Sequence, residues 1–244
     1  NTIAAFDLGI AAGADGLELD VHLSSDGVVV VCHDDTLERT TGVAGLVRSW
    51  SAAGLGRVGA GCRFQDARGD YPFRERGVGV PAFRDVLRRY PSIPLIVQMK
   101  VDSAEVGRGV AGRGGVRGAR DRVCAAGYGQ RALDAARAAL PGMPTSATHA
   151  EVRLAVYRSL ARWPARQLPY RMDQVPERAG LIRVVSPRFL RHAHAAGLRV
   201  QVWTVDDETD MRRLLEWGAD GLITVAAGAG GHAGRLSPFA LIEE

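Results

Sequence analysis

Short apolar runs alternate along this chain with segments that have the residue spacing of amphipathic helices. Residues 16–22 and 200–205 are typical of the runs, and residues 131–140 and 208–217 are typical of the helical segments. Strands and helices that alternate in this way form βαβ units around a parallel sheet. Roughly seven such units can be recognised, and a barrel of this class has eight. The pattern therefore predicts an α/β fold, namely a TIM-type (β/α)8 barrel.

The size and composition of the chain suit one such domain. It has 244 residues, of which 46% are hydrophobic, so a full core can be buried. Residues 36–80 lack a clear periodicity, and we expect a small insertion there, after the second strand. Residues 226–244 are expected to form an irregular tail, which leaves residues 1–225 for the barrel.

A glycine-rich stretch interrupts the pattern at residues 103–120, where a helix belongs between two strands. It contains six glycines, and each glycine costs a helix roughly 1 kcal/mol relative to alanine. Three interpretations stay open: a loop, a badly weakened helix, or the product of a shifted reading frame.

Two carboxylates stand two residues apart in the run at 16–22. Glu18 and Asp20 share one face of a strand, because side chains alternate between its faces. Like charges placed together repel unless a cation or a proton lies between them. Carboxylate oxygens are ligands of hard divalent cations, so the pair indicates a site for Ca²⁺ or Mg²⁺. The alternatives are a solvated strand end and carboxylates paired with arginines.

His33 directly follows the apolar run at residues 28–32 and precedes Asp34. Histidine titrates near neutral pH, and the active sites of β/α barrels lie at the carboxyl ends of the strands. We therefore interpret His33 as a general acid or base, with Asp34 orienting it or capping a turn; a hydrogen-bonded structural histidine is the alternative. We expect His22 to be structural. The histidines that we expect to be surface groups without partners are His149, His192 and His194.

Lys100 is the one lysine among 31 basic residues. It ends the apolar run at residues 95–100 and shares a strand face with Gln98. A chain that otherwise uses arginine keeps a compact ammonium group there, which indicates that a point charge is needed. Chance is the alternative.

The segment 13–45 resembles the glycerophosphodiester phosphodiesterase family. The family pattern runs GAD-x-I-E-x-D-V, then T-x-DG-x-x-V-x-x-HD, then L-x-RTT-x-G. The matching residues are Gly13, Ala14, Asp15, Glu18, Asp20, Val21, Asp26, Gly27, His33, Asp34, Leu37, Arg39, Thr40, Thr41 and Gly45. A lone E-x-D is weak evidence, whereas this order is specific. The resemblance implies a barrel enzyme that hydrolyses glycerophosphodiesters to glycerol 3-phosphate and an alcohol.

The resemblance also implies roles for the site residues. Glu18 and Asp20 correspond to metal ligands, and His33 corresponds to one of two acid/base histidines. Lys100 is similar to a lysine that stabilises charge on the phosphoryl group. Gln98 stands where the family has a Glu ligand; its amide oxygen can coordinate a hard cation but supplies no charge.

The second half of the chain extends the resemblance. Residues 198–224 are similar to the family's V-x-V-W-T-V strand, its M-x-x-L-x-x-x-G helix and its G-x-D-G-I-I-T-D ending. Trp203 corresponds to a tryptophan near the alcohol portion of the substrate, and core packing is its alternative. Val225 departs from the pattern, which has Asp at this position.

The start of the chain departs further from the family pattern. The family begins with a strand that ends in His-Arg-Gly, followed by a loop and a P-E-N-T helix start. Residues 1–6 match the family just after the Pro-Glu. We therefore expect the first barrel strand to be missing, together with one catalytic histidine and a phosphate-binding arginine. With Gln98 and Val225, this predicts impaired hydrolysis. The alternative is a catalytically inactive relative that binds a phosphorylated ligand.

The remaining features narrow the class of partner. No run of 18 apolar residues is present, so no transmembrane helix is expected. A net charge of +4 suits an anionic phosphodiester, and no basic block with interleaved aromatics indicates nucleic acid. Cys32, Cys62 and Cys124 are widely spaced, as expected of thiols in a reducing compartment. We expect a cytoplasmic enzyme that acts on a small-molecule phosphodiester, without stable membrane insertion.

Overall fold

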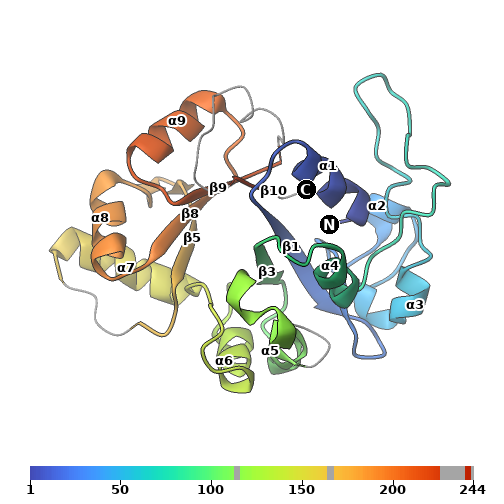
Figure 1. The fold of residues 1–244 in the computed structure, drawn as a ribbon, viewed down its shortest axis with the longest axis horizontal. Coiled ribbons are helices and arrows are strands. Elements are labelled where there is room, and N and C mark those ends of the chain that lie inside the picture. Colours follow the sequence, from blue (N-terminus) through green and yellow to red (C-terminus); the bar gives the residue numbers. More distant parts are fainter. Residues whose placement is uncertain (113–115, 164–167, 226–239, 243–244) are drawn as a thin grey trace.

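The computed structural model describes residues 1–112, 116–163, 168–225 and 240–242. Its strands gather in the middle of the molecule, and its longer helices lie around them (Figure 1). The strands on the main path of the central sheet are β1 (Gly16–Leu23), β3 (Leu95–Met99), β4 (Val123–Gly127), β5 (Met172–Pro176), β8 (Arg199–Trp203), β9 (Gly221–Thr224) and β10 (Ala240–Ile242).

These strands follow the order β4-β3-β1-β10-β9-β8-β5, and every neighbouring pair is parallel. Two isolated parallel bridges, Ala125 with Thr145 and Ser146 with Met172, connect β4 through residues 145–146 to β5. The order of neighbours therefore returns to its start, as it does in a β/α barrel. The predicted α/β barrel class is confirmed.

One position of the barrel is filled in a way that we did not expect. β10 pairs with β9 on one side and with β1 on the other. It occupies the place for which our prediction had no strand. Without it, β1 and β9 would each present an unpaired edge. The prediction of an irregular tail is wrong for residues 240–242, and residues 226–239 and 243–244 lie outside the described residues.

The second predicted strand lies outside the main path of the barrel. β2 (Val29–Val31) pairs antiparallel with the end of β1, so that Val31 lies opposite Val21. The chain reverses at Gly27, whose φ of +74° suits a residue without a Cβ. Our argument that His33 follows a barrel strand is therefore wrong. The hairpin instead returns the chain along β1 and carries His33 back toward Asp20, whose carbonyl accepts the Cys32 N–H.

Helices cover the outside of the barrel, and several begin with side chains that cap their first turn. Thr2, Ser186 and Asp207 accept backbone N–H groups at the starts of α1, α8 and α9. The bounds are α1 (Ile3–Ala11), α4 (Phe83–Arg89), α5 (Ala104–Ala111), α6 (Gln130–Ala139), α7 (His149–Ala161), α8 (Pro187–Ala195) and α9 (Glu208–Glu216). None of the described helices is long and apolar enough to cross a membrane.

The first part of the glycine-rich stretch is a helix, α5, despite its composition. A Cβ placed on Gly107 would lie 2.1 Å from the carbonyl oxygen of Ala132 on α6. A Cβ on Gly109 would lie 3.0 Å from a methyl group of Val29. Glycine thus lets α5 approach α6 and β2 closely, and this packing outweighs the low helix propensity. A short 3-10 helix follows at Val116–Gly118, and residues 113–115 lie outside the described part.

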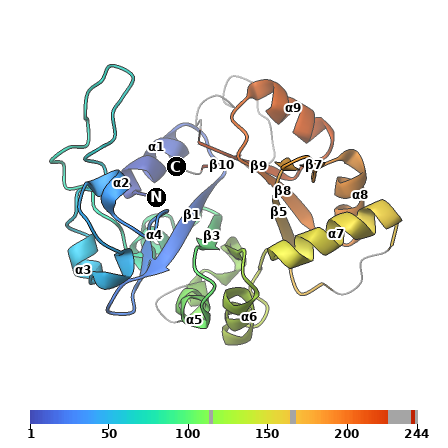
Figure 2. The same ribbon diagram turned by 180° about the vertical axis from the view of Figure 1, so that it is seen from behind.

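The predicted insertion contains short helices and a small core of its own. α2 (Glu38–Thr41), a 3-10 helix (Val47–Ser49) and α3 (Ala52–Leu55) lie within it. Its buried core side chains are Leu37, Val47, Leu55, Val58, Ala60 and Val80, and they pack with Val30 of β2 and with Cys32. In both views of the molecule α2 and α3 lie at the end opposite α7 and α8 (Figures 1 and 2).

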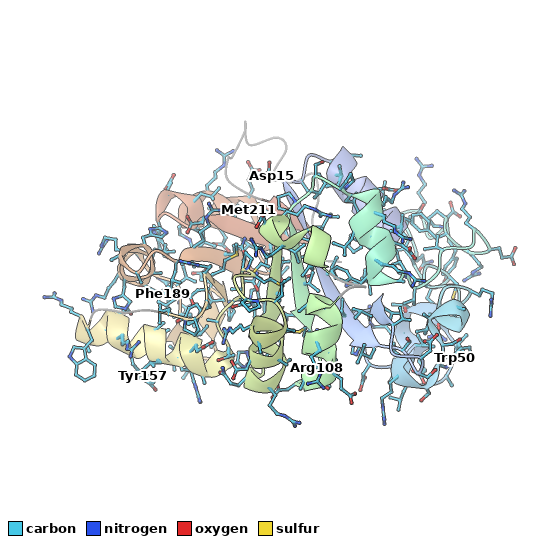
Figure 3. The ribbon with its side chains drawn as sticks, turned by 60° about the horizontal axis from the view of Figure 1, so that its bottom comes forward. Asp15, Trp50, Arg108, Tyr157, Phe189 and Met211 are labelled. Carbon is cyan, nitrogen blue, oxygen red and sulfur yellow. The ribbon has the colours of Figure 1, made fainter. Side chains whose placement is uncertain are left out.

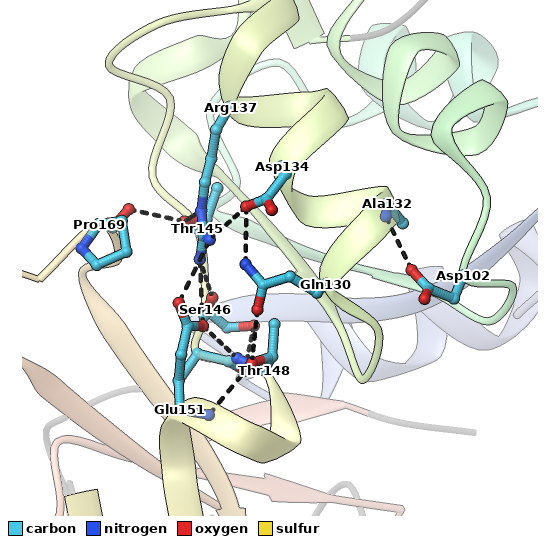
Figure 4. A network of polar contacts seen from close by, with 11 residues as sticks. Asp102, Gln130, Ala132, Asp134, Arg137, Thr145, Ser146, Thr148, Glu151 and Pro169 are labelled. Atoms are coloured by element: carbon cyan, nitrogen blue, oxygen red, sulfur yellow. Dashed lines mark hydrogen bonds and ion pairs between the residues drawn. The ribbon is translucent and has the colours of Figure 1, made fainter. Parts of the chain in front are cut away.

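A polar network holds residues 145–151, where the sheet has only isolated bridges (Figure 4). Arg137 on α6 donates to the Thr145 hydroxyl at 3.1 Å and to the Ser146 carbonyl at 3.2 Å. It also pairs with Glu151 on α7 at 3.5 Å. Glu151 and Thr148 cap α7 reciprocally, since each side chain accepts the other residue's N–H. The network therefore joins α6, α7 and the sheet.

Candidate active site

The two carboxylates of β1 face away from the helices, toward the interior of the barrel. Leu17 and Leu19 alternate with Glu18 and Asp20 and pack in the apolar cluster under the helices. Both carboxylates are buried; Asp20 is 1% exposed. The parallel register of β1 and β3 places Asp20 beside Gln98. The i, i+2 spacing and the register thus bring three oxygen-bearing side chains to neighbouring positions.

Lys100 connects this carboxylate pair to His33. It follows β3 directly, and its backbone N–H donates to the Val21 carbonyl. Its Nζ lies 3.2 Å from Asp20 Oδ1 and 3.3 Å from His33 Nε2. Three residues from the predicted set therefore meet at one point, although they come from three separate segments of the chain.

The other ring nitrogen of His33 contacts Asp34, and this fixes the tautomer. Nδ1 lies 2.6 Å from Asp34 Oδ1, while Arg39 holds the same carboxylate with contacts of 2.6 and 3.2 Å. Hydrogen bonding to Arg39, and then to His33, lowers the pKa of Asp34 to about 2. An ionised carboxylate only accepts, so Nδ1 carries the proton; an ammonium only donates, so Nε2 of the neutral ring accepts from Lys100.

Two residues support this arrangement without an assigned chemical role. Asn1 donates from Nδ2 to Asp20 Oδ2 at 3.1 Å, and its Oδ1 accepts the Asp20 N–H at 2.7 Å. His22 is buried, and its Nε2 lies 3.3 Å from the His33 carbonyl. Burial lowers the pKa of His22, so it holds the His33 backbone as a neutral donor. We did not foresee Asn1, whose sequence position gives no signal, whereas His22 was expected to be structural.

Of the three remaining histidines, His149 and His194 are exposed, as expected, but both have partners, and His192 is not a surface group. His194 Nε2 lies 2.8 Å from Asp220 Oδ2. His149 stacks on Tyr128 with ring centroids 4.3 Å apart. His192 is half-buried and lines a cavity beneath α7 and α8. The partners of His194 and His149 were not foreseen because they are distant in sequence and are brought close only by the fold.

Trp203 ends β8 and so lies at the same end of the barrel strands as Lys100, which follows β3. Its ring centroid is 6.4 Å from that of Tyr128, which follows β4. These aromatic rings form a cluster at the carboxyl ends of the strands. Val225, where the resemblance has Asp, is exposed; its N–H donates to Asp206 at 3.0 Å.

The donor set at β1 and β3 fits a hard divalent cation, with one negative charge fewer than three carboxylates supply. Glu18, Asp20 and Gln98 offer oxygen atoms, the donors that Ca²⁺ and Mg²⁺ prefer. Lys100 balances one of the two buried carboxylate charges. In the described part of the chain no three His, Cys, Asp or Glu side chains are grouped to hold a metal, in accord with an amide at the third position.

Comparisons with known proteins point to one family. The model of the glycerophosphoryl diester phosphodiesterase family matches residues 1–226. A glycerophosphodiester phosphodiesterase of Caldanaerobacter subterraneus is 26% identical over 92% of this chain and 87% of its own length. A probable glycerophosphodiester phosphodiesterase 2 of Mycobacterium tuberculosis is 28% identical over 92% of this chain and 81% of its own length.

Solved structures show the same fold. The glycerophosphoryl diester phosphodiesterase domain of an uncharacterized M. tuberculosis protein superposes with a TM-score of 0.80, at 21% identity, over 96% of this chain and 93% of that domain. A phosphodiesterase of Oleispira antarctica, solved with the product sn-glycerol-3-phosphate, gives a TM-score of 0.68 at 19% identity, over 96% and 90% of the two chains. With the family model matching nearly its whole length, this chain belongs to the glycerophosphoryl diester phosphodiesterase family.

Proposed function

We propose that this chain hydrolyses glycerophosphodiesters to glycerol 3-phosphate and an alcohol, with a divalent cation held by Glu18, Asp20 and Gln98. The family membership supports the reaction type, as does the structural relative that was solved with glycerol 3-phosphate. The observation that carries the proposal is the position of Lys100 Nζ, within 3.3 Å of both Asp20 and His33.

In this proposal His33 moves the proton. Its Nε2 is the free-base nitrogen, because Asp34 holds the proton on Nδ1 at 2.6 Å. Nε2 can therefore accept a proton from an attacking hydroxyl or water and return it to the leaving alcohol. Arg39 positions Asp34, and thereby the imidazole ring, through two hydrogen bonds.

Lys100 acts as a fixed positive charge toward the phosphodiester. Its side chain is only 22% exposed, so its charge is weakly screened. An ammonium beside Asp20 can turn toward the phosphoryl oxygens and stabilise the charge that develops on them. A bound Ca²⁺ or Mg²⁺ would neutralise the phosphodiester and lower the pKa of a coordinated hydroxyl.

Trp203 and Tyr128 are proposed to contact the alcohol portion. Both lie at the carboxyl ends of strands, Tyr128 after β4 and Trp203 at the end of β8, and their rings are 6.4 Å apart between centroids. Aromatic rings at this distance offer an apolar surface on which a small alcohol can pack.

We expect a low rate. Gln98 supplies no charge to the cation, and the described part of the site offers His33 alone for the proton transfers that the family pattern divides between two histidines. The catalytically inactive relative is the rival function, and the same two features favour it.

Phosphorus NMR with glycerophosphocholine as the substrate distinguishes the proposed hydrolase from a catalytically inactive relative. The proposal predicts that the glycerol 3-phosphate signal grows with the protein and a divalent cation, stops on chelation, and does not appear with Lys100→Met. No product, together with calorimetric binding of glycerol 3-phosphate, would establish the rival function instead.

A further inference from the structure

Helix α7 is apolar on both of its long sides. Its inner side packs Val152, Ala155 and Val156 against the core under α7 and α8. Its outer side and the residues just after it expose large apolar side chains: Leu154 (47% exposed), Tyr157 (67%), Leu160 (59%) and Trp163 (69%). We call these four side chains the α7 apolar face. Figure 3 shows Tyr157 on the outer rim of the molecule.

Helix α9 lacks the exposed apolar side chains that α7 carries. The exposed residues of α9 include Thr209, Arg212 and Glu216, which is the polar outer face of an ordinary barrel helix. A helix with large apolar side chains on both its inner and its outer side is expected to be covered on both. Contiguous exposed apolar side chains of this kind mark a surface that meets a membrane or another molecule.

The charges around the α7 apolar face are positive. Arg153 lies on the exposed side of α7, and Arg162 is exposed directly after it. Arg188 and Arg191 are exposed on α8, which packs against α7. The one acidic residue of α7, Glu151, is engaged by Arg137 and by the helix cap. Exposed leucine, tyrosine and tryptophan side chains together with exposed arginines suit the interface of an anionic bilayer, where aromatic rings and basic groups are favoured.

We propose that the α7 apolar face docks this protein on the surface of an anionic phospholipid membrane. Trp163 and Tyr157 would sit at the level of the headgroups, where amphipathic rings are favoured. Leu154 and Leu160 would reach into the acyl boundary, while the arginines contact lipid phosphates. The contact is peripheral. It leaves the site at the carboxyl ends of the strands outside the docking surface, since none of its residues belongs to the α7 apolar face.

Flotation of the 244-residue protein with vesicles tests the proposal. The protein is expected to float with vesicles of phosphatidylcholine mixed with phosphatidylglycerol, and to bind vesicles of phosphatidylcholine alone much more weakly. Leu160→Ser should weaken binding roughly tenfold, because one large apolar side chain no longer leaves water. Arg153→Gln should weaken it roughly fivefold, in a salt-dependent manner.

Leu8→Ser is the matched control. Leu8 on α1 is 60% exposed, against 59% for Leu160, and α1 lies away from α7 in both views (Figures 1 and 2). The proposal predicts that this variant binds vesicles as the parent does. It is overturned if the parent does not float, if Leu8→Ser and Leu160→Ser lose binding equally, or if the parent binds neutral and anionic vesicles alike.

Analytical ultracentrifugation tests the alternative that a second copy of the chain covers the α7 apolar face. A dimer that Leu160→Ser dissociates, with no binding to vesicles, would assign the α7 apolar face to a second copy of the chain and overturn membrane docking. A parent that stays monomeric while it floats supports the proposal.

Discussion

Asp20 and Asp173 are both buried carboxylates in barrel strands, and their surroundings differ completely. Asp20 on β1 faces the interior of the barrel, where Asn1 donates to it and Lys100 pairs with it at 3.2 Å. Asp173 on β5 is 0% exposed and faces the helices. Among the described residues, neither of its carboxylate oxygens has a hydrogen-bond partner. Burial of a carboxylate is therefore not in itself a sign of a catalytic site. The side chains that hydrogen-bond or pair with it are the better indicator.

The surroundings of Asp173 explain how it is tolerated. It lines a small cavity with Arg158, Tyr170 and His192. Burial, and then the negative charge of Glu151, raises the pKa of Asp173 to about 7. Below that pH the group holds its proton and buries no charge. On β1 the charge of Asp20 is balanced by the Lys100 ammonium. On β5 the charge of Asp173 is avoided, because the carboxyl group keeps its proton.

The first prediction follows from this contrast. The pKa of Asp173 is higher in the folded protein than its ordinary value of 3.8, so the folded state retains a proton that the unfolded chain loses. Stability should therefore fall as the pH rises from about 4 to about 7, and then level off. Asp173→Asn should remove this fall and be more stable than the parent by about 4 kcal/mol at pH 8. Urea unfolding of both proteins at pH 4.5 and pH 8 measures this difference in stability. Equal stability of the two proteins at pH 8 would contradict the raised pKa of Asp173.

Asp20→Asn should lower the activity of the protein, whereas Asp173→Asn changes only its stability. The substitution at Asp20 takes the counter-charge from Lys100 and a charged ligand from the cation, so kcat/KM should fall roughly 10²–10³-fold. Asp173→Asn is the matched control and should keep the activity of the parent, because its side chain points away from the site. Comparable losses in the two variants would show that both carboxylates serve catalysis, or that neither does.

Gln98→Glu adds a third carboxylate to the β1 end. If Glu18, Asp20 and residue 98 hold a cation, the new charge should tighten Ca²⁺ or Mg²⁺ binding roughly tenfold and raise the melting temperature when either ion is present. If no cation binds, like charges accumulate and the variant should melt below the parent. Melting with and without each ion separates the two results by their sign.

Trp203→Leu should give the smallest effect. Trp203 contacts Tyr128, and we place only the alcohol portion of the substrate there. The variant should raise KM a few-fold and leave kcat nearly unchanged, because the lost contact is equal in the ground and transition states. A large fall in kcat with an unchanged KM would place Trp203 at the reacting atoms instead.

Much of the fold and the grouping of the site could be predicted because both follow from short-range rules. The alternation of strands and helices determines a parallel barrel. The i, i+2 spacing of Glu18 with Asp20, and of Gln98 with Lys100, puts each pair on one face. Lys100 was predicted from composition, as the one lysine of the chain. These patterns are local in the sequence, so they can be interpreted without knowledge of the tertiary structure.

The features that could not be predicted depend on contacts between distant segments. No local pattern distinguishes a hairpin strand from a barrel strand, so β2 was misplaced. Helix α5 is stabilised because Gly107 lets it approach α6 closely. Helix propensities of single residues do not include such tertiary contacts. Burial of Asp173 beneath α7 and α8 has no sequence signal, because its neighbours on β5 alternate as they would in any strand. The strand at residues 240–242 pairs with β1, more than 200 residues away.

We propose that the contacts linking Arg39, Asp34, His33, Lys100 and Asp20 form a catalytic centre. Its most direct test is the turnover of glycerophosphocholine by the parent, His33→Gln and His192→Gln under identical conditions with a divalent cation. His33→Gln should lower kcat by about 10²–10⁴-fold, while His192→Gln, whose histidine lines the cavity near Asp173, should match the parent. Measurable turnover that His33→Gln leaves unchanged would contradict the claim.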